Sequence, residues 1–263
     1  MKSFVVVAPP YTDTSSGVRA CYRLVHWLNT LGETAYICTT PGPEKPPREW
    51  DIRYRLFASY PIPDNVIAIY PEIYRHNALG AKTVVRWVLN HPGLLGGDTV
   101  YDDGEIIFYA PQLTGPDLYR ESAQKAAGNR EIYPLQTSVH EPHLFYPSKR
   151  TDRKGTCYHV YKGFDAFTKS GGRFPLESWR LIGHPGMNVS RVELGELFRR
   201  SEAFYSWDHA SGITREAAIC GCPTFIVDAE GNTMEVAPVD YAEVVAQYFN
   251  PPAGIERLIE LAR

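Results

Sequence analysis

The sequence lacks any long apolar stretch. None of its runs approaches the roughly 18 consecutive apolar residues that a membrane-spanning helix requires. The apolar run at residues 4–8 is too short for the core of a signal peptide, and Pro9 and Pro10 follow it at once. We therefore expect a cytoplasmic protein with no membrane span, in which residues 4–8 form a β-strand buried on both faces.

An excess of positive charge is also missing. The 27 Lys and Arg residues stand against 30 Asp and Glu, which gives a formal net charge of -3. This balance argues against a broad surface for nucleic acid or anionic membranes. Net charge does not report how the charges are distributed, so a local basic groove for a phosphorylated ligand remains compatible with it.

Cysteines are few and odd in number. The five are Cys21, Cys38, Cys157, Cys220 and Cys222. They show no disulfide framework, which indicates reduced thiols in a cytosolic chain. Cys220-Gly-Cys222 is either half of a metal or redox pair or two small buried thiols before a strand. No second pair accompanies it, which favours the buried thiols.

Several catalytic signatures are absent. The sequence contains no G-x-S-x-G elbow and no phosphate-binding P-loop. Its His, Asp and Glu residues do not cluster at metal-ligand spacing, so no metal site is predicted. Asp102-Asp103 precedes Gly104 and is predicted to form a turn before a strand.

Short apolar runs alternate with helical patterns along the chain. Strands are predicted at residues 4–8, 35–38, 66–70, 106–109, 132–135, 156–161, 179–182, 203–206 and 225–227. Helices are predicted from residue 18 to just before Gly32, and at 81–90, 192–199, 214–220, 241–248 and 254–262. This order is the βαβ pattern of doubly wound parallel sheets.

A polar, charged run at residues 148–154 predicts a linker between two domains. We expect an N-terminal Rossmann-like domain at 1–148 and a C-terminal Rossmann-like domain at 149–240. Residues 241–263 are expected to form helices that pack back on the first domain. Open α/β sheets bind ligands at the carboxyl ends of their strands, so a cleft between the two domains is the expected site.

The segment from Phe204 to Pro223 carries the strongest chemical signal. It is predicted to run from a strand through a polar loop into a helix that Ser211 caps, and Gly212 allows a ligand close to the backbone. The amino end of a helix presents free N–H groups and a positive dipole end, which suit a diphosphate. Asp208 before the helix and Glu216 within it offer carboxylates to hydroxyl groups on either side of that phosphate.

The pattern Asp208-x7-Glu216 resembles the E-x7-E signature of family-4-like retaining glycosyltransferases, with Asp in place of the first Glu. The Ala-Ala-Ile-Cys-Gly-Cys-Pro continuation is similar to the family's small-residue and Gly-x-Pro segment. The resemblance implies the GT-B variety of α/β fold, in which two Rossmann-like, doubly wound domains face each other across a cleft. It also implies donor-binding residues: Asp208 at the sugar, Ser211, Gly212 and Ile213 at the phosphate, and Glu216 at the ribose.

The alternative from the residues alone is that Asp208 is a loop residue and Glu216 merely favours the helix start. Lys162-Gly163 matches the Lys-Gly of the same family, which implies that Lys162 reaches the leaving diphosphate and stabilises its charge. A lysine at a strand end is also commonly just solvated. The upstream arginine that often accompanies this lysine has only Arg153 as a candidate.

The N-terminal domain offers weaker candidates. Ser16 and Gly17 at a helix start suit a loop that approaches the donor phosphates or the acceptor, and they suit simple capping equally. Glu72 and His76 follow a strand and are candidates for handling an acceptor hydroxyl, with a structural role as the alternative.

Arg86 either holds a phosphate or pairs structurally together with Trp87, and the sequence favours the structural role. The block at residues 84–93, in which both lie, is similar to one in small bacterial and viral sugar transferases. His140 and His143 are predicted to lie at the surface.

Together the resemblance implies a retaining, metal-independent glycosyltransferase, with Lys162 and Asp208 as the catalytic groups. It would need no cofactor beyond a UDP-, GDP- or ADP-sugar donor. The acceptor hydroxyl belongs to a saccharide, to a small molecule or, less readily for an acidic chain, to a modified DNA base. The alternatives are an epimerase or phosphorylase of the same fold, and a non-catalytic protein that binds sugar nucleotides.

Overall fold

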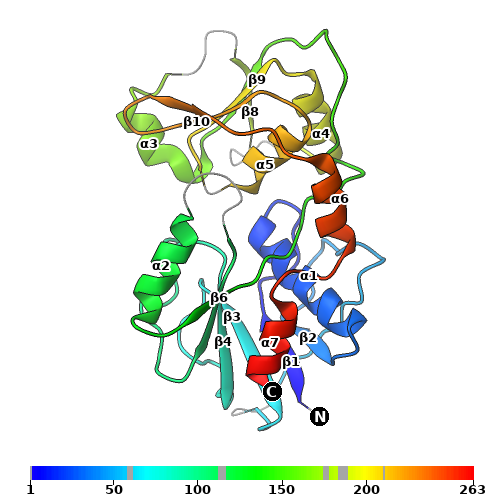
Figure 1. Cartoon of the computed structure of the whole chain (residues 1–263), viewed down its shortest axis with the longest axis vertical. Helices are drawn as coiled ribbons and strands as arrows, with labels where there is room; N and C mark the ends of the chain where they lie inside the picture. The colour runs from blue at the N-terminus through cyan, green and yellow to red at the C-terminus, as the bar shows by residue number, and fades with distance from the viewer. Residues whose placement is uncertain (1, 58–61, 112–116, 174–177, 183–188, 210) are drawn as a thin grey trace. The chain divides into compact units, whose positions relative to one another are not determined.

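A computed structural model describes residues 2–57, 62–111, 117–173, 178–182, 189–209 and 211–263, with backbone only for Leu118 and residues 178–182. The chain divides into two compact units (Figure 1). The first unit contains Met1–Val139 and Phe249–Arg263, and the second contains His140–Tyr248. The predicted boundaries after residues 148 and 240 both fall inside the second unit.

The first unit is built on a parallel sheet of six strands in the order β2-β1-β3-β4-β5-β6. The strands are β1 (Ser3–Val7), β2 (Ala35–Cys38), β3 (Val66–Pro71), β4 (Thr83–Val88), β5 (Ile106–Tyr109) and β6 (Ile132–Pro134). Phe4 of β1 pairs with Ala35 of β2 on one side and with Ile67 of β3 on the other. The predicted parallel pairing of these segments is confirmed.

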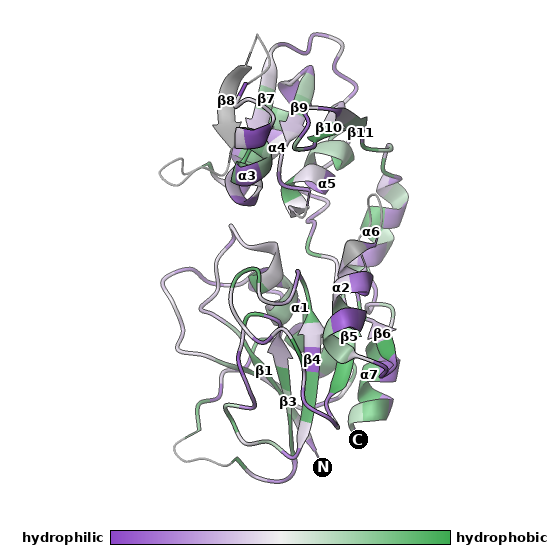
Figure 2. Cartoon of the chain, turned by 90° about the vertical axis from the view of Figure 1, so that its left-hand side faces the viewer, coloured by the Kyte–Doolittle hydropathy of each residue, from purple (hydrophilic) through white to green (hydrophobic). Residues whose placement is uncertain are grey.

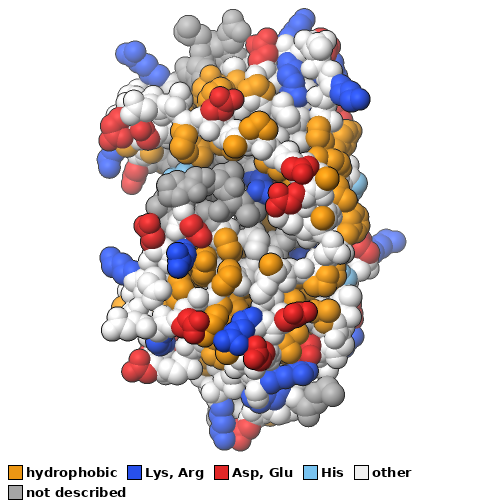
Figure 3. Space-filling model, in the orientation of Figure 1, with side chains coloured by type: hydrophobic (Ala, Val, Ile, Leu, Met, Phe, Trp, Pro, Cys, Tyr) orange, Lys and Arg blue, Asp and Glu red, His pale blue; other side chains and the backbone are white. Residues whose placement is uncertain are grey.

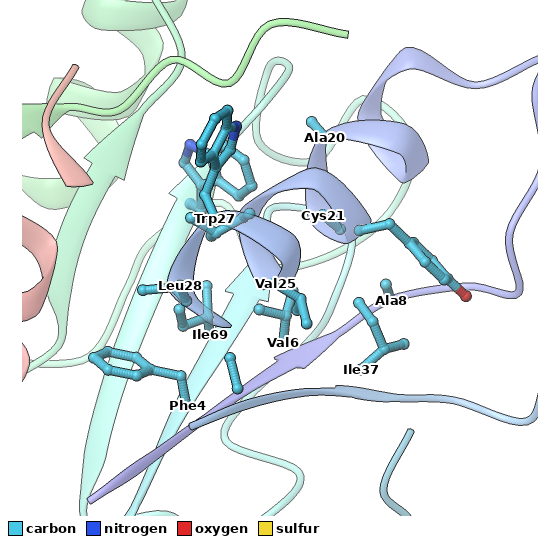
Figure 4. Close-up of a cluster of buried hydrophobic side chains, with 14 of the residues drawn as sticks. Phe4, Val6, Ala8, Ala20, Cys21, Val25, Trp27, Leu28, Ile37 and Ile69 are labelled. Carbon is cyan, nitrogen blue, oxygen red and sulfur yellow. The ribbon is translucent and has the colours of Figure 1, made fainter. Parts of the chain in front are cut away.

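Apolar side chains are buried on both faces of this sheet, which is why its central strands read as continuous apolar runs. Figure 2 shows the hydropathy of each residue along these strands. Phe4 and Val6 of β1 point into a core with Val25 and Leu28 of the following helix (Figure 4). Val5, between them, is equally buried and belongs to a second core on the opposite face. Strand β1 is therefore covered by apolar side chains on both faces.

Three helices cover the sheet, which are α1 (Ser16–Thr30), α2 (Leu118–Ala127) and α7 (Ile255–Ala262). Helices α1 and α7 share one core, whereas the alanines of α2 pack with Ile107 and Tyr109 in another. The side chain of Ser15 caps α1 by accepting a hydrogen bond from the Val18 N–H, and Gly32 follows the helix end with φ 85°. Helix α2 was not predicted.

The helix predicted at residues 81–90 is wrong, because this segment contains strand β4, paired with β3 and β5. Its run of valines and Trp87 is buried on both faces of the sheet, so it shows neither a helical nor an alternating period. The connections at residues 72–82 and 89–105 contain no helix, although parallel strands usually need one. Loop side chains such as Leu79 cover the sheet there instead.

Arg86 on β4 has the structural role that the sequence favours. It is 1% exposed, and its guanidinium donates three hydrogen bonds of 2.8–3.0 Å to the Glu105 carboxylate. The rings of Tyr70 and Tyr101 lie 5.2 and 5.3 Å from the guanidinium carbon. The indole N–H of Trp87 donates to the carbonyl of Leu135 at 3.0 Å. The side chains of Arg86 and Trp87 therefore form hydrogen bonds inside the first unit and stabilise it.

The second unit is built on a five-stranded sheet in the order β11-β10-β9-β7-β8. Its strands are β7 (Thr156–His159), β8 (Ser178–Ile182), β9 (Ala203–Ser206), β10 (Thr224–Val227) and β11 (Thr233–Glu235), and only β11 is antiparallel to its neighbour. The helical segments are η1 (Tyr161–Gly163), α3 (Phe164–Lys169), α4 (Arg191–Arg200), α5 (Gly212–Ile219) and α6 (Tyr241–Phe249).

The two sheets share one topology. In each, the first strand along the chain, β1 or β7, lies between the second and the third, which is the order of flavodoxin-like doubly wound sheets. The prediction of an α/β chain with two Rossmann-like units is therefore confirmed. Ligands of such sheets bind where the strand order reverses, at the carboxyl ends of β1 and β3 or of β7 and β9.

The surface carries both signs of charge. Lysine and arginine side chains are interspersed with aspartate and glutamate on the face shown in Figure 3. Among the helices of the described segments, none combines the length and the apolar character needed to cross a membrane.

The close approach of Gly254 to the sheet generates a prediction. Gly254 precedes α7 with φ 88°, and a Cβ there would lie 2.0 Å from the carbonyl oxygen of Pro134. Gly104 has φ 87° but no atom within 4 Å of its Cβ position. We expect Gly104→Ala to cost about 1 kcal/mol of unfolding free energy, which is the backbone strain alone. Gly254→Ala should cost at least about 2 kcal/mol, since overpacking adds to the strain. Urea denaturation of both variants measures the difference, and equal losses would contradict the close packing of α7.

Candidate active site

The site predicted in the second unit lies at the point where the strand order of its sheet reverses. His159, the last residue of β7, pairs with Ser206, the last residue of β9. The chain segments that leave the two strands therefore start side by side. Lys162 and Gly163 follow β7, and Asp208 follows β9. Lys162 and Asp208, which are 46 residues apart in the sequence, are brought together in this way.

Gly163 is the point of contact between the two segments. A Cβ on residue 163 would lie 2.1 Å from the carbonyl oxygen of Trp207 and 2.7 Å from the amide nitrogen of Asp208. Gly163 has φ -85°, which any residue adopts, so the glycine is required by this contact and not by its own conformation. The Lys-Gly pair thus places Lys162 beside the Asp208 loop.

Lys162 lies in a tight turn. The strand predicted to reach Tyr161 ends at His159, and the short helix η1 begins at Tyr161. Tyr161 is 57% exposed and has a positive φ of 29°, a conformation that a bulky side chain rarely adopts. Lys162 itself is half-buried, and the turn is compact because the Gly163 N–H donates to the carbonyl of Val160.

Asp208 is only 3% exposed. The hydroxyl of Ser206 donates to the carbonyl of Asp208 at 3.0 Å, and the same hydroxyl oxygen accepts the Asp208 N–H at 3.2 Å. The carbonyl of Asp208 also accepts the N–H of Ser211. The backbone at Asp208 is therefore fixed on both sides, and its carboxylate starts from a rigid turn.

The helix that follows begins as predicted. Ser211 is the N-cap of α5, and its hydroxyl oxygen accepts the Ile213 N–H at 3.4 Å. Gly212 and Ile213 form the first turn of α5. A phosphate bound there would take over or share the N–H group of Ile213 that now contacts Ser211. Thr214, in the same turn, is 1% exposed, and its hydroxyl has no hydrogen-bond partner among the described residues.

Glu216 lies one turn further along α5 and is 1% exposed. Its Oε1 lies 3.0 Å from Nη2 of Arg191, the first residue of α4, and 3.4 Å from Nδ1 of His140. The same Nη2 of Arg191 also donates to Glu141. Burial by itself lowers the pKa of Arg191, but the charges of Glu216 and Glu141 outweigh it and raise that pKa. The guanidinium therefore stays charged between two carboxylates.

Two expectations from the sequence are corrected by these contacts. His140 was expected at the surface, yet it is 7% exposed and contacts Glu216, whereas His143 is exposed as expected. Arg153, the candidate partner of Lys162, donates instead to the carbonyls of Phe198, Ser201 and Cys220. It holds the carboxyl ends of α4 and α5, which is a structural role.

His159 is a site residue that the sequence did not indicate. It is 1% exposed, and no described residue hydrogen-bonds to its Nδ1. Burial lowers its pKa to about 4, with the nearby charge of Asp208 opposing and that of Lys162 reinforcing the shift. His159 is therefore neutral at pH 7. Nothing in the sequence pointed to it, because the strand was predicted to continue to Tyr161 and His159 was therefore placed within it.

The candidate residues of the first unit come after strands β1 and β3 along the chain, and thus after the carboxyl ends of these strands. Ser16 and Gly17 form the first turn of α1, but the capping group is Ser15. Glu72 is 4% exposed and accepts the N–H of Leu89, which ties the ends of β3 and β4 together. The side chain of His76 is 81% exposed, and its backbone N–H donates to Asp98. Glu72 is thus buried and His76 exposed, and the hydrogen bonds that the two residues make stabilise loops.

Among the described residues, no group of three or more His, Cys, Asp or Glu side chains is arranged to hold a metal ion. Cys220 and Cys222 are buried, and burial raises the pKa of both thiols, that of Cys220 to about 12. They are neutral thiols in the core, as the sequence favoured.

No protein-family model matches the sequence, and no curated protein is similar to it. Two solved structures resemble the fold over almost the whole chain. One is T4 phage BGT in complex with its UDP-glucose substrate, with a TM-score of 0.48 and 10% identity over 99% of this chain and 90% of that chain. The other is T4 phage β-glucosyltransferase, with a TM-score of 0.45 and 11% identity over 100% of this chain and 92% of that chain. At such identities no residue role transfers to this chain.

The contact at Gly163 predicts how much the addition of a single methyl group at this position lowers the stability of the protein. Gly163→Ala should lower the unfolding free energy by about 1–3 kcal/mol, since the Trp207 carbonyl must move to make room. Gly17→Ala is the matched control, because the nearest atoms to its Cβ position lie 3.9 and 4.0 Å away. The control should be neutral or slightly stabilising, since alanine favours helices. Urea denaturation of the two variants measures both effects, and a Gly163→Ala protein as stable as the parent would show that the contact is looser than described.

The lowered pKa of His159 predicts a pH dependence of stability. Below pH 6.5 the unfolded state binds a proton at this position, whereas the folded state does not until about pH 4, so stability falls as the pH falls through this window. At pH 5 the loss relative to pH 7 is about 2 kcal/mol from this residue. His159→Gln removes the titrating group and should lose about 2 kcal/mol less over the same range. Denaturation at pH 7 and pH 5 tests this, and identical losses in parent and variant would exclude it.

Proposed function

We propose that the protein is a retaining, metal-independent glycosyltransferase of the GT-B type, which moves a sugar from a nucleoside-diphosphate sugar to an acceptor hydroxyl. One observation carries the proposal. Lys162, Asp208 and the start of α5 meet at the reversal point of one parallel sheet, where open α/β sheets bind ligands. Glu216, on the same helix, supplies a buried carboxylate next to that point.

Each group has a role that its chemistry supports. The amino end of α5, with Gly212 and Ile213, binds the diphosphate through its N–H groups and dipole. Lys162 adds a positive charge on the side of β7, Asp208 accepts hydrogen bonds from sugar hydroxyls, and Glu216 accepts them from the ribose. In the reaction the bond between the anomeric carbon and the phosphate oxygen breaks, and a bond to the acceptor oxygen forms on the same face.

The acceptor proton passes to the departing diphosphate in this scheme. The protein therefore needs to position the reactants and stabilise the charge on the leaving group, and it needs no nucleophile of its own. Lys162 and the α5 N–H groups act most strongly when that charge develops. Asp208 fixes the sugar that is transferred. Loss of the Asp208 carboxylate should therefore impair catalysis more than it impairs donor binding.

We assign acceptor binding to the first unit, with Ser16, Gly17, Glu72 and His76 as its candidate residues. The donor is a UDP-, GDP- or ADP-sugar, and the acceptor hydroxyl belongs to a saccharide, a small molecule or a modified base. A cytoplasmic location is part of the proposal, in keeping with five unpaired cysteines.

Nucleotide binding tests the donor site. Isothermal titration and thermal shift with UDP, GDP and ADP should identify one that stabilises the protein by roughly 2.7 kcal/mol at 100 times its dissociation constant. Lys162→Met should weaken binding of that diphosphate by about tenfold to hundredfold, the effect of losing one charged hydrogen bond. Lys169→Met, an exposed lysine at the end of α3, is the matched control and should bind as the parent does. The corresponding nucleoside without phosphate should not distinguish the two variants.

Catalysis is tested with the matching nucleotide sugar, by following release of the nucleoside diphosphate with and without pooled acceptors. Asp208→Asn should bind the nucleoside diphosphate as tightly as the parent yet release it from the sugar far more slowly. A parent that binds no nucleotide would refute the donor site. A parent that binds the donor but never turns it over with any acceptor would instead be a non-catalytic binding protein.

A further inference from the structure

Two buried polar groups of the second unit are not satisfied by the fold. They are Nδ1 of His159, at the end of β7, and the hydroxyl of Thr214, in the first turn of α5. Each residue is 1% exposed, and neither atom has a hydrogen-bond partner among the described residues. A buried polar atom without a partner costs stability, because it gives up its hydrogen bonds to water and gains none in return. Such atoms are few in folded proteins, and a binding or catalytic role is one reason why they are kept.

The alternation of side chains along β7 places His159 on the face of the sheet that α5 covers. Cys157, two residues before His159, belongs to the same core as Ala217 of α5. Tyr158, between the two, packs against a different core. Successive side chains of a strand point to opposite faces, so His159 lies on the same face as Cys157, one step nearer the carboxyl end of the strand.

Thr214 borders the same layer from the side of the helix. Ala217 and Ala218 follow it by three and four residues, so the three side chains share one face of α5, and all three are buried. Helix α5 connects β9 to β10, which are parallel. A helix that connects two parallel strands runs back along the sheet, so the first turn of α5 lies at the carboxyl ends of the strands. His159 and Thr214 therefore lie at the same end of the layer between the sheet and α5.

Both groups can donate hydrogen bonds to an anion. A threonine hydroxyl is a donor, and a neutral imidazole carries one N–H. His159 is neutral at pH 7, because burial lowers its pKa to about 4, and Lys162 is near enough for its charge to reinforce this shift. The N–H groups and the dipole of α5 favour an anion at this end of the helix as well. A lysine, a helix start and two unsatisfied donors thus lie at one end of the second sheet.

We infer that His159 and Thr214 are two further binding residues for the diphosphate of the donor, and that they donate hydrogen bonds to its oxygens from the side of the sheet. The inference rests on the proposed function, in which this diphosphate lies at the start of α5. Both atoms are shielded from water in this structure, and rotation about the side-chain bonds turns them toward the ligand. Each group then gains the partner that the fold does not supply, so its loss weakens the complex without weakening the free protein.

Thr224 supplies a matched control. It is also 1% exposed and lies in the same unit, on β10. Its hydroxyl, however, donates to the carbonyl of Cys222 at 2.8 Å. Valine has nearly the shape of threonine and lacks the hydroxyl. Thr224→Val therefore removes a hydrogen bond of the fold, whereas Thr214→Val removes a buried atom for which the described residues offer no partner.

The first test needs no ligand. Thermal denaturation should give Thr214→Val a melting temperature equal to or above that of the parent, since an unsatisfied buried group is removed. Thr224→Val should melt below the parent, because its hydrogen bond is lost. A Thr214→Val protein that melts below the parent as Thr224→Val does, or that does not fold, would show that the Thr214 hydroxyl has a structural role. That result overturns the inference.

The second test measures dissociation constants by titration calorimetry, with whichever of UDP, GDP and ADP the parent binds and with the corresponding nucleoside. Thr214→Val and His159→Leu should each weaken binding of the diphosphate by about tenfold to hundredfold, the effect of one hydrogen bond to a charged group. Both variants should bind the nucleoside as the parent does. Thr214→Ser, which keeps the hydroxyl, should bind the diphosphate nearly as tightly as the parent, and so should Thr224→Val.

The outcomes separate this inference from the proposed function. Either Thr214→Val or His159→Leu binding the diphosphate with the affinity of the parent overturns the inference. An equal loss of affinity for the nucleoside overturns it as well, because the two groups would then act away from the phosphates. A parent that binds none of the nucleotides refutes the proposed function itself.

Discussion

The backbone contact of Gly163 with Trp207 and Asp208 is the constraint on which the second unit's site depends. Parallel pairing of β7 with β9 brings their carboxyl ends together, but pairing alone leaves the following residues free to diverge. The absence of a Cβ at residue 163 lets the turn after β7 lie directly on the turn after β9. The backbones of Lys162 and Asp208 are then held by two turns, each closed by its own hydrogen bonds. Preorganisation of this kind is what charge stabilisation of a leaving group requires.

Each unit of this protein holds a buried arginine that contacts two carboxylates. Arg86 lies in the middle of strand β4, and its guanidinium contacts the carboxylates of Glu105 and Asp98 and the faces of two tyrosine rings. Arg191 stands at the beginning of a helix, and two carboxylates compete for it. Both arginines are buried, so burial alone does not identify a site. Their places in the fold distinguish the two, since Arg86 lies within a strand and Arg191 begins a helix.

Local patterns were sufficient to predict most of the strands and the residues that follow them. Runs such as Phe4 to Ala8 are continuous because both faces of the sheet are covered, and that is visible in the sequence. Burial on both faces also led to the wrong prediction for residues 81–90. A segment that is apolar on every side shows no periodic pattern that would distinguish a strand from a helix. Helix α2 was missed because its buried face consists mainly of alanines among charged residues, although Asp117 and Gly128 mark its two ends.

The residues of the candidate site likewise divide into those that the sequence indicated and those that it did not. Lys162, Asp208, Ser211 and Glu216 belong to short motifs, and a motif can be found in one segment of chain. Arg191 and Glu141 are 50 residues apart and meet only because α4 and the segment before β7 pack together. His159 was missed because the strand that contains it was predicted to reach Tyr161, so the histidine was not placed at the strand end. Interactions between distant segments are products of the fold, and a single sequence without its structure does not display them.

Asp208 shows how such a constraint bears on the position at which this sequence differs from the motif that it resembles. The related signature has a glutamate at this position, whose side chain is one methylene longer. Here the backbone of residue 208 is fixed by Ser206 and Ser211 and is pressed against Gly163, and the residue is 3% exposed. A longer side chain starting from the same point would have to displace its neighbours, at a cost typical of overpacked cores. The shorter carboxylate is therefore the one that fits this turn.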